Sequence, residues 1–560
     1  MFYLLIFLWF VRGVKTILFW LYLWQLKEYH IGRFIAHFRT EKGKRLLINK
    51  RLALKVFSLL VLGFCWYLFI PFFDSYPFPI SFLRIFSNAL LNMVALIVLG
   101  NLVLYSLEVL KAGKDILHKE TKIPVLTKKT IVLILATLFT QVLFTFWILG
   151  QDFASAKDLT LTLFYLLIFD ILTPLTVSLI VLLFQPLAIL GRSRIINRAK
   201  KKRAKFKDLL VVGITGSYGK TSTKEILAVI LAEKFKVLKT KEHRNSEIGV
   251  SQCILEELKP EHEIFICEMA AYNKGGIKLL SDIVKPKIGI LTGINQQHLA
   301  TFGSQENIVK AKFELIESLP EDGTAILNAD NEFIRQELET KKFKNQKLYS
   351  TKDKLDIWAE EVEVDKESIR FKVCINNDSA NFEFSLLGAQ NIPNILAAIC
   401  CAKELGMSLS EIALAGEKIK PLPRSMKLYK AKGNLNVIDA TYSANPDGVI
   451  SHLNYLHAWR GRKVIIMPCL IELGKTAPAV HQQIGAKIAK VCNLAIITTK
   501  ECYYDIKRAA MKNGMKEESI LFLEESPEIL RKIKKFVRPG DVVLLESRVP
   551  TEVVKSLTED

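Results

Sequence analysis

The chain of 560 residues is longer than one domain, and with half of its residues hydrophobic it has ample material for buried cores. The formal net charge of +21 would suit a nucleic-acid-binding protein, but many of the basic residues flank hydrophobic segments, where they act as membrane topology signals. We therefore expect no nucleic-acid partner. The nine cysteines form no C-x-x-C pair, which fits reduced thiols in a cytosolic compartment.

The first 190 residues contain apolar segments that are long enough to span a membrane. There are five of them, at 2–24, 53–73, 85–107, 130–149 and 159–190. The loops alternate in charge, because 27–50 and 111–129 are basic whereas 74–84 and 151–158 carry little charge. By the positive-inside rule this alternation puts the N-terminus outside and everything after residue 190 in the cytoplasm. We expect a transmembrane domain of about five helices over residues 1–191.

The fifth segment is too long for one straight helix and contains Asp170, Pro174 and Pro186. A strongly tilted or kinked helix fits, and so does a span followed by an interfacial stretch. Asp170 is either a functional polar site or a carboxyl placed near the interface or paired within the bundle, and we favour the second. The basic run 192–207 is predicted to be a juxtamembrane linker whose charges face anionic lipid headgroups.

Residues 209–224, LLVVGITGSYGKTSTK, predict a strand and a glycine turn, followed by a helix whose pattern covers 224–235. Backbone N–H groups and the helix dipole of such a unit cradle phosphate, while a lysine reaches the terminal phosphates and a hydroxyl binds Mg²⁺. The residues expected to bind the nucleotide are Gly216, Ser217, Gly219, Lys220, Thr221 and Ser222. The pattern G-x-x-G-x-x-G-K-T departs from the usual Walker spacing, and the alternative is a plain glycine turn with a solvated lysine.

After this loop, strands and helices alternate in the pattern of a parallel α/β sheet. The apolar strand 264–267 ends at Glu268, at the sheet edge where a Mg²⁺ ligand belongs in such folds. Strand 288–291 is followed by a loop with His298 and by a helix, 305–317, with Lys312.

The remainder of the chain predicts a β-rich stretch, a helix and then a second α/β unit. The β-rich stretch covers 340–385, a turn into a helix covers 388–405, and a boundary lies at 421–424. Strands of the second unit are expected near 463–467, 494–498, 519–523 and 541–545. The predicted domains are therefore 1–191, the linker 192–207, a nucleotide-binding domain 208–423 and a C-terminal domain 424–560.

Several separated motifs of the soluble half match one family in order and spacing. They are GITGSYGKTSTK at 213–224, NSEIGV at 245–250, EM at 268–269, HLATFGSQENIVKAKFEL at 298–315, NAD at 328–330, GAQNIPNILAA at 388–398, LPR at 422–424, DATYSANPDG at 439–448 and ELG at 472–474. With these motifs the chain resembles the Mur ligases, ATP-dependent amide-forming enzymes of peptidoglycan synthesis. It is most similar to the branch that adds D-alanyl-D-alanine (MurF).

The resemblance implies a central P-loop ATPase domain and a C-terminal Rossmann-like domain, with ATP and Mg²⁺ as cofactors. In this family ATP phosphorylates a substrate carboxylate, and an amine then attacks the acyl phosphate. The residues implied to carry this chemistry are Lys220, Glu268, His298, Lys312 and Arg424.

The same resemblance assigns individual ligands. Thr221 and Glu268 would bind one Mg²⁺, and His298 would bind a second together with Lys312, provided that this lysine is carbamylated. Adenine, the γ-phosphate and ribose would be bound by residues of the later motifs. These are Asn394, with Asn391, for adenine, Arg424 for the γ-phosphate and Asp439 for ribose. Because these ligands come from both α/β units, closure of the C-terminal domain should assemble the site.

Three departures from the family pattern concern the substrates. A multispan domain stands where the family has a soluble domain for the UDP-linked substrate, and the family's D-D-x-Y-N-A-N-P reads DATYSANP at 439–446. The family's G-D-M-x-E-L-G and K-G-S-R motifs appear as PCLIELG at 468–474 and Glu546-Ser-Arg548. The expected function is a ligase of the bacterial plasma membrane that joins D-alanyl-D-alanine or a similar amine to a UDP-linked or lipid-linked muropeptide. The alternatives are a relative that uses another amine, and a transporter or scaffold that only binds nucleotide.

Overall fold

The structure is a computed structural model that describes residues 2–559, with gaps. The gaps are 39–40, 75–79, 119–120, 152–155, 243, 298, 377, 422–424, 432 and 443–444. The described chain forms two compact units that meet between Gly191 and Arg192, a helical unit and an α/β unit.

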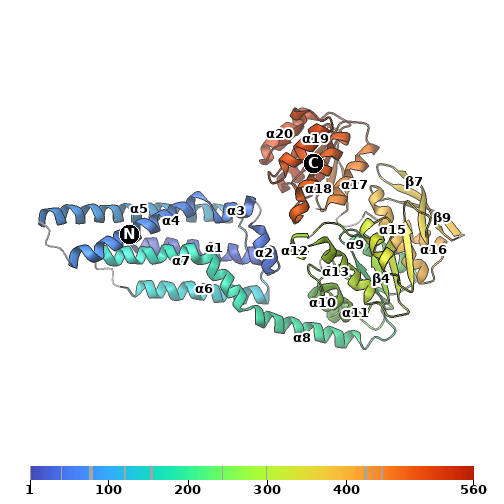
Figure 1. Cartoon of the computed structure of the whole chain (residues 1–560), viewed down its shortest axis with the longest axis horizontal. Helices are drawn as coiled ribbons and strands as arrows, with labels where there is room; N and C mark the ends of the chain where they lie inside the picture. The colour runs from blue at the N-terminus through green and yellow to red at the C-terminus, as the bar shows by residue number, and fades with distance from the viewer. Residues whose placement is uncertain are drawn as a thin grey trace. The chain divides into compact units, whose positions relative to one another are not determined.

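The first unit is built of long helices that run alongside one another and of two short helices, the second and third along the chain (Figure 1). They are α1 (Phe2–Leu26), α2 (Ile31–His37), α3 (Glu41–Leu47), α4 (Lys50–Asp74), α5 (Ile80–Leu117), α6 (Lys128–Leu149) and α7 (Ala156–Leu183). α1 packs against α5, α6 and α7, and α4 packs against α7. Over the described residues, four stretches are long and apolar enough to cross a membrane, namely Tyr3–Leu26, Asn92–Leu117, Lys128–Leu149 and Thr160–Arg203. The predicted second span, 53–73, forms α4, but most side chains of its C-terminal part lie outside the described residues.

The predicted fifth span divides into two helices. α7 continues through Pro174 to Leu183, and α8 (Gln185–Arg203) follows after a single residue. Asp170 is buried and forms ion pairs with Arg12 and Lys55, which confirms that its carboxyl is paired within the bundle.

The basic run 192–207 is predicted to be a juxtamembrane linker whose charges face anionic lipid headgroups, and two of its cations, Lys202 and Arg203, have protein partners. It is helical up to Arg203, and its end packs on the α/β unit. Lys202 Nζ donates to the carbonyl of Leu255 at 3.0 Å, and Arg203 Nε donates to the carbonyl of Val284 at 2.9 Å. These two cations therefore hold protein carbonyls, an interaction that charge patterning alone does not reveal.

The middle domain contains a nine-stranded sheet in the order β2-β3-β1-β4-β5-β6-β7-β8-β9. Its strands are β1 (Leu210–Thr215), β2 (Val237–Lys239), β3 (Ile264–Glu268), β4 (Ile288–Leu291), β5 (Thr324–Asn328), β6 (Gln346–Ser350), β7 (Ile357–Val364), β8 (Ile369–Ile375) and β9 (Asp378–Phe384). The pairs from β2 to β7 are parallel, as the alternating pattern predicts, whereas β7, β8 and β9 pair antiparallel. The predicted β-rich stretch is thus confirmed as an extension of the same sheet.

Helices cover both faces of this sheet. They are α9 (Lys220–Leu231), α10 (Glu247–Glu257), α11 (Gly276–Val284), α12 (Leu299–Phe302), α13 (Gln305–Glu317), α14 (Glu332–Thr340), α15 (Ile392–Glu404) and α16 (Leu409–Gly416). Successive side chains of a strand point to opposite faces, so Val212 and Ile214 pack with α9 and α15 while Val211 packs with α10, α11 and α13. Burial on both faces explains why the central strands read as continuous apolar runs.

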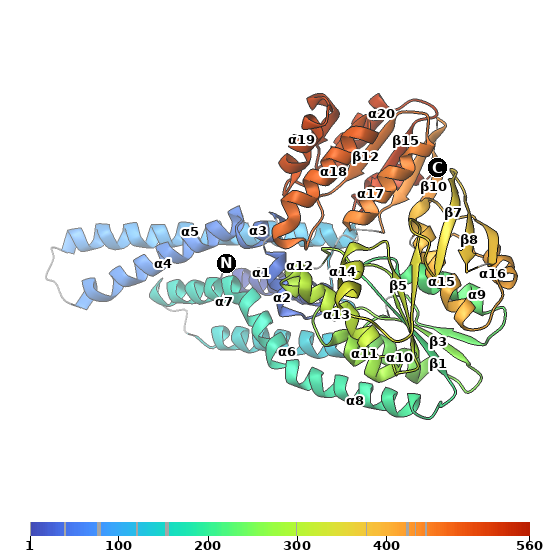
Figure 2. The same cartoon turned by 45° about the vertical axis from the view of Figure 1, so that its right-hand side comes forward.

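The C-terminal domain has a six-stranded sheet in the order β10-β11-β15-β12-β13-β14, with helices around it (Figure 2). Its strands are β10 (Lys427–Ala431), β11 (Leu435–Ala440), β12 (Lys463–Met467), β13 (Leu494–Ile497), β14 (Ile520–Phe522) and β15 (Val542–Glu546). Its helices are α17 (Pro446–Tyr455), α18 (Ala477–Val491), α19 (Tyr503–Lys512), α20 (Ser526–Phe536) and α21 (Thr551–Thr558). The four strands predicted after residue 460 are all confirmed.

Candidate functional site

The phosphate loop connects the end of β1 to the start of α9. Gly219 is the N-cap of α9 and has φ +79°, in the left-handed region that glycine adopts without strain. In the described chain no side chain caps this helix, so its first N–H groups face the loop and can bind an anion. The loop is held to the neighbouring strand because the N–H of Ser217 donates to the carbonyl of Gly293 at 2.7 Å.

Lys220, the first residue of α9, folds its side chain back over this loop. Its ammonium donates to the carbonyls of Gly216 at 2.7 Å and Ser217 at 3.4 Å. Burial lowers the pKa of this lysine, and the charge of Glu268 raises it in part. The cation is therefore held where the terminal phosphates of a nucleotide in the loop would lie.

Glu268 ends β3, the strand next to β1, and its carboxylate reaches the first turn of α9. The hydroxyl of Thr221 donates to both carboxylate oxygens at 3.1 Å, and Asn245 Nδ2 donates to Oε1 at 2.9 Å. Burial raises the pKa of this carboxyl, but the charges of Lys220 and Lys224 outweigh burial, and the pKa is lowered overall. The acid is therefore an anion at neutral pH, as a metal ligand must be.

Lys224 and Asn245 are site residues that the sequence analysis did not assign. The side chain of Lys224 is fully buried, and its Nζ lies 3.3 Å from Glu268 Oε2 and 3.2 Å from Glu225 Oε1. Lys224 lies one helical turn after Lys220, and this i, i+4 spacing could have revealed that both cations share a face.

Lys312, on α13, is 4% exposed. Burial, together with the charge of Lys220, lowers the pKa of its amine to about 7. A large part of this lysine is therefore neutral at physiological pH, which is the state in which an amine reacts with carbon dioxide. His298, its predicted partner at a second metal site, lies outside the described residues.

The side chains around the loop fit Mg²⁺ better than a metal ion whose ligands are all supplied by the protein. Among the described residues, no three His, Cys, Asp or Glu side chains gather as a metal cluster. The groups present are one ionised carboxylate and one hydroxyl, from Glu268 and Thr221. Mg²⁺ usually takes one or two carboxylates and completes its shell with water and substrate phosphates. The site therefore fits a metal that arrives with a nucleotide.

The two asparagines of the 388–398 motif have different surroundings. Asn394 lies on α15, which packs against α9, and its Oδ1 accepts a hydrogen bond from Thr223 at 3.4 Å. Asn391 is buried, and its Nδ2 donates to the carbonyls of Leu387 at 3.0 Å and Gly388 at 3.3 Å. The structure therefore brings Asn394 to the phosphate loop, while the Asn391 amide holds the turn before α15. Adenine recognition stays a prediction for both.

Alanine at position 219 is expected to destabilise the phosphate loop. A Cβ there would collide with Oδ1 of Asn394, and the positive φ would add backbone strain. We expect a loss of about 2–4 kcal/mol, measured by chemical unfolding, with weaker nucleotide binding. Gly275→Ala is the matched control, because Gly275 has φ +80° at a helix N-cap and open space around it. If both variants lose the same stability, Asn394 does not pack against the loop.

Two predicted ligands belong to the C-terminal part of the chain. Asp439 is the penultimate residue of β11, and its Oδ1 accepts hydrogen bonds from the N–H of Thr441 at 2.9 Å and from the hydroxyl of Thr441 at 2.7 Å. Arg424 lies outside the described residues, so its role stays a prediction. The role of Ser222, the third residue of α9, also stays a prediction.

A contact that the sequence analysis missed joins the two α/β domains at the phosphate loop. Asn295 Nδ2 donates to Asp447 Oδ2 at 2.7 Å, and the N–H of Asn295 donates to Oγ of Ser217 at 3.2 Å. Asp447 lies in the first turn of α17, and burial raises its pKa. The C-terminal domain therefore reaches the loop through one carboxyl and one amide.

The C-terminal domain also buries a polar chain at one of the positions that depart from the family pattern. His452 Nδ1 lies 2.7 Å from Glu546 Oε2, and the hydroxyl of Tyr442 lies 3.2 Å from His452 Nε2. Both His452 and Glu546 are at most 1% exposed. This buried polar chain therefore links α17 to the last residue of β15.

Comparison with known proteins agrees with the motifs. A family model for the Mur ligase middle domain matches residues 214–402, and one for the Mur ligase glutamate ligase domain matches 426–548. A UDP-N-acetylmuramoyl-tripeptide–D-alanyl-D-alanine ligase of Synechocystis sp. is 30% identical over 60% of this chain and 71% of its own length.

Solved structures extend the likeness to the fold. MurF from Acinetobacter baumannii superposes with a TM-score of 0.59 at 26% identity, over 65% of this chain and 80% of that one. MurF from Thermotoga maritima, solved in complex with ADP, gives a TM-score of 0.58 at 26% identity, over 65% and 83%.

Proposed function

The chain belongs to the Mur ligase family and is an ATP-dependent amide-forming ligase, and we propose that it adds an amine to a muropeptide carboxylate through an acyl phosphate. The amine proposed is D-alanyl-D-alanine or a similar dipeptide, as the names of its relatives suggest. The observation that carries the proposal is the convergence of Lys220, Thr221 and Glu268 at the phosphate loop.

In the proposed reaction a carboxylate oxygen of the muropeptide attacks the γ-phosphorus of ATP, and ADP leaves. The amine nitrogen then attacks the acyl carbon, loses a proton, and phosphate leaves as the amide forms. Lys220 and the N–H groups at the start of α9 would bind the phosphates and offset the repulsion between the two anions. Arg424 would add positive charge at the γ-phosphate, Asn394, with Asn391, would bind adenine, and Asp439 would bind ribose.

Thr221 and Glu268 would hold Mg²⁺ in this reaction, and its charge would lower the cost of transferring the phosphoryl group. The charges of Lys220 and Lys224 lower the pKa of the Glu268 carboxyl, so this ligand stays ionised at neutral pH. A carbamylated Lys312, together with His298, would hold a second ion, because carbamylation turns the amine into a carboxylate-like group.

Ligation is expected to depend on bicarbonate and to rise with pH between about 6 and 8. The pKa of Lys312 is lowered to about 7, so below pH 7 the protonated amine does not react with carbon dioxide, and above pH 7 the neutral amine does. The measurement is the initial rate in bicarbonate-depleted and bicarbonate-supplemented buffer at each pH. Lys312→Ala should lose the dependence and regain activity with a short carboxylate such as acetate. A rate that ignores bicarbonate at every pH would contradict the carbamate.

The membrane part of the proposal is that the helical unit anchors the ligase in the plasma membrane of a bacterium, with the α/β unit in the cytoplasm. Four apolar stretches of spanning length and the alternating charge of the loops support it. An enzyme held at the membrane has no need of a UDP pocket if its muropeptide is linked to a lipid. Ligation of matched UDP-linked and lipid-linked muropeptides, followed by mass spectrometry of the products, tests this step, and exclusive use of the UDP-linked form would overturn it.

The competing function is a transporter or scaffold whose α/β unit only binds nucleotide. The buried, low-pKa amine of Lys312 beside the phosphate site favours the ligase, because a unit that only binds nucleotide needs no such group. Oxygen-18 in the substrate carboxyl separates the two functions. Transfer of the label to released phosphate supports the acyl phosphate, whereas phosphate release that is independent of any amine indicates an ATPase.

A further inference from the structure

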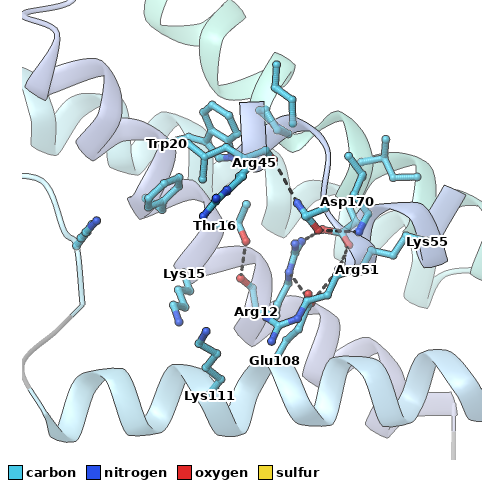
Figure 3. Close-up of a pocket in the computed structure, with 18 of the residues that line it drawn as sticks. Arg12, Lys15, Thr16, Trp20, Arg45, Arg51, Lys55, Glu108, Lys111 and Asp170 are labelled. Atoms are coloured by element: carbon cyan, nitrogen blue, oxygen red, sulfur yellow. Dashed lines mark hydrogen bonds and ion pairs between the residues drawn. The ribbon is translucent and has the colours of Figure 1, made fainter. Parts of the chain in front are cut away.

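The helical unit contains a cavity of about 860 Å³ that is lined by both charged and apolar side chains, and this volume is typical of sites for small molecules (Figure 3). It is lined by residues of α1, of the region from α3 to α4, of α5, of the segment after α5 and of α7. Ionisable groups inside an apolar bundle cost free energy and are kept mainly where they serve a pathway or a ligand. Neither the phosphate loop nor the chemistry proposed above uses any of these groups.

The floor of the cavity is a balanced network of ions. Arg12 pairs with Glu108 at 3.0 Å and also with Asp170, and Lys55 pairs with Glu108 at 2.8 Å and with Asp170 at 2.9 Å. The hydroxyl of Tyr105 donates to Asp170 at 3.1 Å. Two cations meet two carboxylates, and the four side chains converge in Figure 3. This floor is neutral, and its carboxylates are already occupied, so they do not attract a cationic ligand.

The remaining lining is strongly cationic. Eight cationic side chains and three carboxylates line the cavity, which leaves five positive charges in excess. Lys15 pairs with Asp115 at 2.6 Å, the third carboxylate. The other cations of the lining have exposed side chains, and they are Arg45, Lys50, Arg51, Lys111 and Lys122. Such a concentration of arginine and lysine suits a ligand with several phosphate oxygens.

Apolar side chains line the same cavity. They include Phe19, Trp20, Leu47, Leu52, Ile171, Leu172 and Leu175. The exposed cations lie in α3, at the start of α4, near the end of α5 and just after α5. These positions fall in or beside the basic stretches 27–50 and 111–129, which the positive-inside rule puts at the cytoplasmic surface. A ligand that satisfies both linings has an anionic head at this surface and an apolar chain.

We propose that this cavity binds the diphosphate headgroup of an isoprenoid lipid. The excess cations hold the two phosphates, and the aromatic and aliphatic side chains contact the first part of the chain. This inference rests on the helical unit alone. A further step, that the bound lipid carries the carboxylate to be ligated, rests on the proposed function.

The test uses the full-length protein in phosphatidylcholine nanodiscs, with saturating ADP so that the phosphate loop is filled. Binding of farnesyl diphosphate, inorganic pyrophosphate and farnesol is measured by calorimetry. Farnesyl diphosphate is expected to bind at least about tenfold more tightly than either of the others. If pyrophosphate binds as tightly as farnesyl diphosphate, the site takes a free diphosphate and the lipid proposal is wrong. Failure of farnesyl diphosphate to bind would also overturn the proposal.

Two double variants that lose the same charge test whether the lipid binds in the cavity. Lys50→Gln with Lys111→Gln removes two cations of the lining and leaves the ion-paired floor intact, and should weaken farnesyl diphosphate binding about tenfold or more. Lys114→Gln with Lys128→Gln removes two exposed lysines that do not line the cavity and should leave binding unchanged. Equal weakening by both pairs, or full competition by phosphatidylglycerol, would show a general anionic-lipid surface and overturn the proposal. These binding measurements do not require ligase activity, so the absence of ligation in a separate assay would not affect the conclusion about lipid binding.

Discussion

Lys220→Ala is expected to lower the rate of ATP-dependent ligation about a thousandfold. The ammonium of Lys220 lies over the phosphate loop, within hydrogen-bonding distance of the carbonyls of Gly216 and Ser217. Removing a cation that stabilises developing phosphate charge in a partly buried site typically costs about 3–4 kcal/mol of transition-state stabilisation. The measurement is the rate of amide product formation by mass spectrometry, together with ATP affinity.

The control for this variant is Lys236→Ala, which removes an exposed lysine just before β2. It lowers the net charge equally and should leave the rate unchanged. A Lys220→Ala protein that still ligates within tenfold of the unaltered rate would show that the loop does not hold the reacting phosphates.

Glu268→Gln is expected to affect both catalysis and stability. The amide keeps the shape of the side chain but loses the charge that would bind Mg²⁺, so the rate should fall about a hundredfold, with a higher requirement for Mg²⁺. The buried ammonium of Lys224 also loses one of its two carboxylates, which should destabilise the fold by roughly 3 kcal/mol. Rates across a Mg²⁺ titration and chemical unfolding separate the two effects.

Glu225→Gln provides the comparison, because Glu225 is the other carboxylate beside Lys224, at 3.2 Å. It should share the loss of stability while keeping the Mg²⁺ dependence of the unaltered protein. If Glu225→Gln lowered the rate as much as Glu268→Gln, the catalytic effect would arise from misplacement of Lys224 and not from a lost metal ligand.

Much of the α/β unit was predictable because its strands are buried on both faces and end at polar residues. The strand at 288–291 and the helix at 305–317 have the predicted bounds, and β3 ends at Glu268 as expected. The start of α9 was predicted four residues late, at Lys224, because Lys220, Thr221 and their neighbours are polar and show no apolar periodicity. The N-cap glycine with its positive φ marks the true start.

The site was only partly predictable. The glycine motif indicates Lys220 and Thr221. The end of the apolar strand 264–267 indicates Glu268, since strand ends of a parallel sheet lie at one edge. Neither pattern indicates Asn295 or Asp447, because these two residues lie 152 positions apart in the chain and belong to different domains. Similarly, the glycine pattern gives no sign that Asn394 packs against Gly219, since this depends on the packing of α15 on α9.

By itself, the sequence determined the family, the alternation of strands and helices, and the apolar segments of the first unit, because each is written in local periodicity, spacing or charge. Only the tertiary structure decided which charges meet. It buried Lys224 against Glu268, lowered the pKa of Lys312 by burial and by the charge of Lys220, and paired Asp170 with Arg12 and Lys55. The physical reason is that electrostatic interactions depend on distance and burial, and both are set by how helices and strands pack.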